Sequence, residues 1–169
     1  MVKILQPITS TWLDYPDKED CSLVVVMMGC DNGCPKCQNP DFKNPHYTNN
    51  TKEYTVESLI DELKILAKRN RTDKIVLSGG DPLSCFNINF TKEFLLKTDL
   101  KVCIYTGHDI EYVKKHNVTG FEFVKCGLFE ENKFQESEKT NEYMKFASTN
   151  QQLFDSNYCC VSQNGIYLF

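Results

Sequence analysis

Short apolar runs, rich in β-branched side chains, recur along the chain and predict strands. They cover residues 22–28, 74–78, 101–105 and 120–125. The first run is apolar throughout, which is typical of a strand covered on both faces of a parallel sheet.

Helical periodicity lies between these runs. Over residues 55–69 the apolar positions recur at i, i+3, i+4 and i+7, and Thr55 can serve as the N-cap. Further helices are expected at about 89–98 and from Asp109 through His116. Strands that alternate with helices predict βα units, an α/β fold and a parallel sheet, with ligands at the carboxyl ends of the strands.

The pattern changes after residue 130, where charged residues precede two short strands around the hairpin-turn pair Asn164-Gly165. We expect one domain over residues 1–169. Four or five βα units cannot close an eight-stranded barrel, which takes about 200 residues or more. One side of the sheet should therefore be open, and an open side is a docking surface.

Composition and charge narrow the class of protein. Hydrophobic residues make up 41% of the chain, which predicts a folded globule, and the net charge of −4 argues against a nucleic-acid partner. The longest apolar run, residues 23–28, is too short to cross a membrane, and no secretory signal is visible. A cytoplasmic location follows as an expectation, in which the nine cysteines stay reduced.

Three of these cysteines, Cys30, Cys34 and Cys37, form a C-x3-C-x2-C pattern directly after the first strand. Clustered thiolates bind zinc or iron–sulfur clusters. A structural zinc needs a fourth ligand, for which the candidates are Cys85, Cys126, Cys159 and Cys160. A 4Fe–4S cluster with three ligands leaves one iron open. Gly33 is expected to give the loop a positive φ.

A second pattern, Gly79-Gly80-Asp81-Pro82, follows the second buried strand. The two glycines can let a ligand approach the backbone, and the Asp81 carboxylate can bind a cationic group. The alternative is a simple tight turn.

The two patterns together resemble the radical S-adenosylmethionine (SAM) superfamily, which has C-x3-C-x2-C after the first strand and Gly-Gly-Glu or Gly-Gly-Asp-Pro on the next. This resemblance implies an open partial (β/α) barrel with parallel strands and a short C-terminal hairpin. It also implies a 4Fe–4S cluster on the three cysteines, and SAM bound through its amine and carboxylate to the open iron. Lys36 stands where an aromatic residue is usual, so its backbone is expected to contact the adenine.

Further segments resemble one branch, the activating proteins of anaerobic ribonucleoside-triphosphate reductase. They are 78–83, 105–107, 121–127 and 148–151, or Ser-Gly-Gly-Asp-Pro-Leu, Tyr-Thr-Gly, Phe-Glu-Phe-Val-Lys-Cys-Gly and Ser-Thr-Asn-Gln. Such an enzyme cleaves SAM reductively and removes a hydrogen from a glycine of the reductase large subunit. Its expected partners are that subunit and a one-electron donor such as flavodoxin, with no nucleic acid and no membrane.

The resemblance also implies a set of site residues. The expected SAM contacts are Lys36, Cys37, Gln38, Gly79, Gly80, Asp81, Pro82, Thr106 and Lys125, and the residues expected to shape the site are Asn39, Asn150 and Gln151. Solvation of Lys125, turn capping by Thr106 and hairpin support by Asn150 and Gln151 are the structural alternatives. The functional alternatives are another small radical SAM enzyme (7-carboxy-7-deazaguanine synthase or a different glycyl radical enzyme activase) and a non-catalytic metal-binding interaction module.

Overall fold

A computed structural model of the chain describes residues 1–18 and 21–169. Its centre is an eight-stranded sheet. Seven of the strands follow the order β10-β7-β6-β5-β3-β1-β4, and the eighth, β2, pairs with β3. Four strands in its middle run parallel, namely β3 (Ser22–Met27), β5 (Lys74–Gly79), β6 (Lys101–Tyr105) and β7 (Phe123–Cys126). The predicted parallel sheet is confirmed.

Antiparallel strands occupy both ends of this sheet. They are β1 (Val2–Leu5), β2 (Thr9–Thr11), β4 (Thr51–Tyr54) and β10 (Gln152–Asp155). The sheet is therefore mixed, and the expected open partial (β/α) barrel is not confirmed. β2 and β4 are short and mostly polar, and β1 has only four residues, so the apolar pattern did not predict them.

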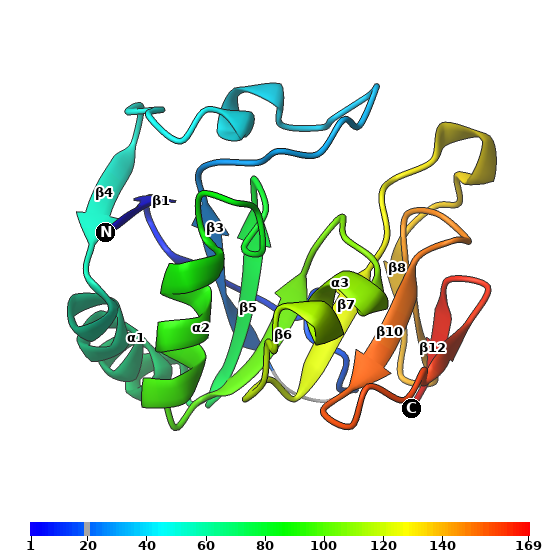
Figure 1. The fold of residues 1–169 in the computed structure, drawn as a ribbon. Helices are drawn as coiled ribbons and strands as arrows, with labels where there is room; N and C mark the ends of the chain where they lie inside the picture. The colour runs from blue at the N-terminus through cyan, green and yellow to red at the C-terminus, as the bar shows by residue number, and fades with distance from the viewer. Residues whose placement is uncertain (19–20) are drawn as a thin grey trace.

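The helices are α1 (Val56–Asn70), α2 (Ile88–Lys97) and α3 (Ile110–Lys115), with 3-10 turns η1 (Pro40–Lys43) and η2 (Glu131–Lys133). Thr55 caps α1 as predicted. Its side chain accepts a hydrogen bond from Ser58 N, and Thr55 N donates one to Ser58 Oγ. In Figure 1, α2 and α3 lie in front of the central sheet. No helix in the described part of the chain is long and apolar enough to cross a membrane.

The predicted hairpin at Asn164-Gly165 is confirmed, with φ values of 50° and 71° that suit its turn. It is, however, part of a second, four-stranded antiparallel sheet rather than an isolated hairpin. That sheet has the order β11-β12-β9-β8 and consists of β8 (Glu138–Lys139), β9 (Tyr143–Lys145), β11 (Ser162–Gln163) and β12 (Ile166–Leu168).

The two faces of the parallel strands bury different neighbours. Leu23, Ile75 and Ile104 point into the main core, which the helices cover. Their sequence neighbours point to the opposite face, where Tyr105 and Phe123 pack against Met144, Phe146 and Leu153. The second sheet therefore lies on the face without helices, and the site is formed there.

Candidate metal and cofactor site

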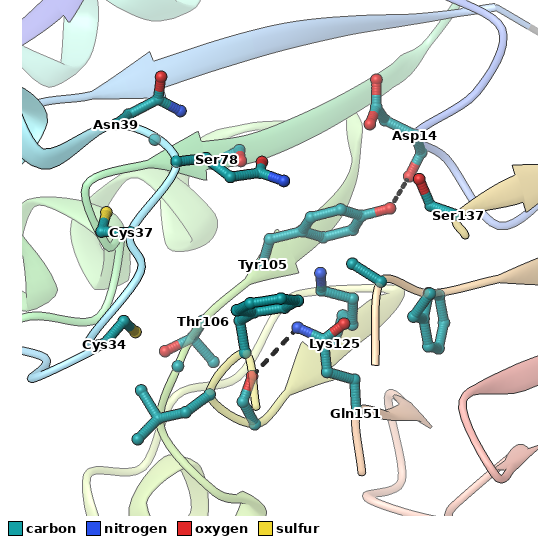
Figure 2. A pocket seen from close by; sticks show the side chains of 18 of the residues that line it. Asp14, Cys34, Cys37, Asn39, Ser78, Tyr105, Thr106, Lys125, Ser137 and Gln151 are labelled. Atoms are coloured by element: carbon teal, nitrogen blue, oxygen red, sulfur yellow. Dashed lines mark hydrogen bonds between the residues drawn. The ribbon is translucent and has the colours of Figure 1, made fainter. Parts of the chain in front are cut away.

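A cavity of about 500 Å³ lies at the carboxyl ends of the parallel strands, on the face without helices. Each parallel strand contributes one side chain to its wall: Val26 from β3, Ser78 from β5, Tyr105 from β6 and Lys125 from β7. Because side chains alternate along a strand, these four share one face. Figure 2 shows Cys34 and Cys37 on one side of this cavity and Tyr105 and Lys125 near its centre.

The three clustered cysteines line this cavity as free, half-buried thiols. The chain leaves β3 at Gly29, whose φ of 98° favours glycine. Gly29 N then donates to Phe42 O at 2.8 Å, and Cys30 N to Lys43 O at 3.1 Å, so η1 supports the loop from behind. The expectation for Gly33 is wrong, because its φ is not positive and no atom lies within 4 Å of the place where a Cβ would sit.

The cysteine arrangement suits a shared cluster better than a closed zinc site. Among the described residues, no three His, Cys, Asp or Glu side chains gather closely enough to hold a single ion. The candidate fourth ligands Cys85, Cys126, Cys159 and Cys160 do not line the cavity. A tetrahedral zinc needs four ligands around one point, whereas a cubane takes each thiolate on a different iron. Three thiols that face one cavity therefore fit a 4Fe–4S cluster.

The Cys30 thiol has a hydrogen-bond donor of its own. Burial raises the pKa of Cys30, and a hydrogen bond from Asn32 N to Cys30 Sγ at 3.4 Å acts in the opposite direction. A donor aimed at the sulfur stabilises the thiolate that ligation requires.

The two glycines of the Gly-Gly-Asp-Pro segment line the cavity, but close backbone packing is what requires them. Gly79 has a φ of 109°, and a Cβ there would lie 2.5 Å from Met27 O. A Cβ on Gly80 would lie 2.5 Å from Gly29 O. The segment therefore packs directly against the chain that leads into the cysteines.

Asp81 has a different environment from the one expected. Its side chain is 1% exposed and does not line the cavity, and neither does Pro82. Its carboxylate accepts hydrogen bonds from Leu83 N at 2.8 Å, Thr106 Oγ1 at 2.9 Å, Gly107 N at 2.8 Å and Asn32 Nδ2 at 2.5 Å. Burial raises the pKa of Asp81, and the bonds from Gly107 and Leu83 oppose that rise. A carboxylate with this many internal donors has little capacity left for a ligand amine.

Lys125 has the opposite character. Its Nζ lies 4.1 Å from the centre of the Tyr105 ring and 5.7 Å from that of Phe146, and no described residue gives it a hydrogen bond or an ion pair. Burial lowers the pKa of Lys125 to about 8. An ammonium group without a counter-ion, at a cavity wall, is suited to bind an anion.

Gln151 adds an unused acceptor to the same cavity. Its Nε2 donates to Gly127 O at 3.3 Å, while its buried Oε1 has no partner among the described residues. Asn150 faces elsewhere and donates to Leu128 O at 2.8 Å. Of the predicted residues, the cavity brings together Cys30, Cys34, Lys36, Cys37, Gln38, Asn39, Gly79, Gly80, Thr106, Lys125 and Gln151.

Comparison with known proteins agrees with this geometry. A family model described as a 4Fe-4S single cluster domain matches residues 19–154, which is most of the chain. The chain belongs to this family. Over 70 residues it is also 36% identical to a Methanocaldococcus jannaschii protein provisionally named a glycyl-radical enzyme activating enzyme. That match covers 41% of this chain and 25% of the relative, so the chain spans about a quarter of the relative's length.

This 4Fe-4S single cluster domain has site residues that sequence reasoning missed. Lys43 lines the cavity and donates from Nζ to Cys34 O at 3.4 Å. Met144 and Phe146 form an apolar wall from the second sheet, and Leu13 and Phe129 lie at other parts of the lining. A lysine in a polar loop and isolated apolar residues carry no pattern that could have assigned them to a site.

Proposed function

We propose that this protein is a radical SAM activase that generates a glycyl radical on the large subunit of anaerobic ribonucleoside-triphosphate reductase. One observation carries the proposal: three free cysteine thiols and a lysine without a counter-ion face the same cavity. When bound, the cluster supplies the single electron for reductive cleavage of the SAM sulfonium. The protein's own residues bind and orient the reactants.

Cys30, Cys34 and Cys37 would hold the cluster, and the free side of the cavity would hold SAM. Lys125 would bind the SAM carboxylate, because its ammonium group lies at the cavity wall and pairs with no carboxylate among the described residues. The free Gln151 Oε1 would accept a hydrogen bond from a SAM hydroxyl or amine. Together, a cation and a hydrogen-bond acceptor would suit the carboxylate and the amine of the amino-acid part of SAM.

The backbone of the strand ends would complete the binding site. Lys36, Gln38, Gly79 and Gly80 line the cavity near the cysteines, and their peptide groups can contact the adenine and the amino group. The Thr106 hydroxyl already donates its hydrogen to Asp81. Thr106 Oγ1 would therefore contact SAM as a hydrogen-bond acceptor. Asn39 would shape the cavity, whereas Asp81, Pro82 and Asn150 would act outside it.

Apolar side chains would exclude water from the reacting groups. Phe146 and Met144 line the cavity, and the Tyr105 ring lies against Lys125. A glycine-bearing loop of the partner would enter the cavity from the open side of the sheet. A donor such as flavodoxin would deliver the electron at the cysteine loop.

The choice of partner rests on the segment resemblances, and the name of the relative supports a glycyl radical enzyme in general. The test is to mix the reconstituted protein, SAM and reductant with an anaerobic ribonucleotide reductase and to record the electron paramagnetic resonance (EPR) spectrum. A glycyl doublet is expected, and it should vanish when the acceptor glycine of the reductase is replaced by alanine.

Two other results would redirect the proposal. SAM cleavage without a doublet would favour a different glycyl radical enzyme, which the relative's name allows, or a small-molecule substrate such as that of 7-carboxy-7-deazaguanine synthase. Tight binding of one zinc, with no SAM cleavage, would indicate an interaction module.

A further inference from the structure

We propose that Asp81 and Asn32 form a positioning pair that aims the Asn32 backbone N–H at the Cys30 sulfur and thereby makes the cluster easier to reduce. The inference rests on the proposed function only in taking Cys30 as a cluster ligand. Asp81 is thus a positioning residue rather than a contact of SAM.

The Asp81 carboxylate is the rigidly held member of this pair. Its backbone is held because Asp81 N donates to Gly29 O at 2.9 Å and the buried Asn87 side chain donates to Asp81 O at 2.9 Å. Its side chain is held by donors from the end of β6, Thr106 Oγ1 and Gly107 N. A buried carboxylate bonded from several sides has one allowed orientation.

Asn32 is the other member of the pair and lies in the loop between the first two cysteines. Its Nδ2 donates to Asp81 Oδ2 at 2.5 Å, and its backbone N donates to Cys30 Sγ at 3.4 Å. The side-chain bond therefore fixes the residue whose backbone faces the sulfur. No regular secondary structure holds this part of the loop.

A third residue leaves room for the pair. A Cβ on Gly107 would lie 2.5 Å from Asn32 Nδ2, although the φ of Gly107 is not positive. A side chain at position 107 would therefore displace the end of the Asn32 side chain, whereas the backbone conformation there suits any residue. This steric relation is separate from the hydrogen bonds and concerns the same contact.

The physical effect follows from charge. Reduction adds one negative charge to a cluster and its thiolates, and a hydrogen bond to a ligand sulfur stabilises that added charge. Loss of the aimed N–H should therefore make reduction harder. Asn32→Ala keeps the backbone N–H but loses its anchor, so this variant isolates positioning from the donor itself.

The experiment uses the reconstituted protein without SAM and compares wild type, Asp81→Asn, Asn32→Ala and the double variant. EPR-monitored redox titration is the readout, with iron loss to a chelator as a second measurement. We expect Asn32→Ala to show an about tenfold lower ratio of reduced to oxidised cluster at a fixed potential, equal to about 59 mV for one electron. Asp81→Asn loses the same anchor but also removes a negative charge near Cys30, which by itself eases reduction, so its ratio should lie above that of Asn32→Ala. The double variant should match Asp81→Asn, because both changes break one linkage.

Asp41→Asn is the matched control, since Asp41 is exposed on η1 and its carboxylate has no hydrogen bond among those described. It should leave the potential unchanged. If Asp81→Asn does not fold, Asn32→Ala and Gly107→Ala decide the question, because both disturb the contact and leave the carboxylate in place.

Wild-type potentials in both Asn32→Ala and Asp81→Asn would overturn the inference, and so would fully additive shifts in the double variant. Neither result touches the proposed function. That proposal fails separately if Cys30→Ala retains a complete cluster.

Discussion

Polar groups next to the cysteine loop and at the cavity wall have opposite surroundings. Next to the cysteine loop but outside the cavity, the Asp81 carboxylate is buried and accepts hydrogen bonds from three neighbouring segments. At the cavity wall, the Lys125 ammonium and Gln151 Oε1 have no such partners among the described residues. A polar group satisfied within the protein supports the structure, whereas one left unpaired in a cavity is available to a ligand.

This difference separates two residues that the resemblance treats alike. Asp81 lies just after β5 and Lys125 lies near the end of β7, and both were expected to contact SAM. From their surroundings we propose that Asp81 has a positioning role and that Lys125 binds the ligand. The following predictions test that division, from the largest expected effect to the smallest.

Asp81→Ala should destabilise the fold by about 3–5 kcal/mol, because several buried donors lose their acceptor together. Urea unfolding of the cluster-free protein measures this change. The exposed Asp41→Ala should stay within about 0.5 kcal/mol of wild type. Equal stability of the two variants would mean that the Asp81 network contributes little.

Lys125→Met should weaken SAM binding by about tenfold to a hundredfold, the range expected when a bond to a charged group of about 1.5–3 kcal/mol is lost. Methionine preserves much of the packing of the side-chain stem. Equilibrium dialysis with the reconstituted protein checks the affinity, and iron content serves as the control because the cysteines are untouched. An unchanged affinity would remove Lys125 from the SAM site.

The same lysine predicts a pH dependence of stability. Its pKa is about 8 in the folded protein and near 10.5 in the unfolded chain, so only the unfolded state is protonated between these values. The wild type therefore gains stability relative to Lys125→Met as the pH rises from about 8 to 10.5, by up to about 3 kcal/mol. Below pH 8 the full penalty of the buried charge is present, so the variant should be the more stable protein there.

Thermal unfolding at several pH values, with both proteins free of cluster and SAM, tests this relation. A constant difference between wild type and Lys125→Met across the range would contradict the lowered pKa.

The smallest effect concerns the cysteine loop. Gly33→Ala should leave the stability and the iron content within experimental error, since its φ is not positive and a Cβ there would meet no atom. Gly29→Ala is the informative contrast, because Gly29 has a positive φ and lies close to Phe86 and Pro45. Loss of iron in Gly33→Ala would restore the original expectation for that glycine.

Much of the central fold followed from local patterns. The β-branched apolar runs predicted β3, β5 and β6, because a continuous apolar run reflects burial on both faces of a sheet. Thr55 predicted the start of α1 through its capping chemistry. The short strands β8 and β9 could not be predicted, because two or three residues are too few to show a period. Their pairing depends on the tertiary structure.

The sequence predicted many of the residues that line the cavity, but not the surroundings of each side chain. The spacing of the cysteines and the strand-end position of Lys125 were visible in the sequence. The burial of Asp81 was not, because it arises where Asn32, Thr106 and Gly107 meet from distant parts of the chain. Lys43 was also missed, since its contact with Cys34 depends on the fold of η1 against the loop.

The central claim is that Cys30, Cys34 and Cys37 together hold a cluster that cleaves SAM. The most direct measurement is anaerobic reconstitution with iron and sulfide, followed by SAM cleavage under dithionite, for wild type, Cys34→Ala and the exposed-cysteine control Cys159→Ala. We predict about four irons and SAM cleavage in wild type and Cys159→Ala, with both lost in Cys34→Ala. A complete cluster and full cleavage in Cys34→Ala would contradict the account.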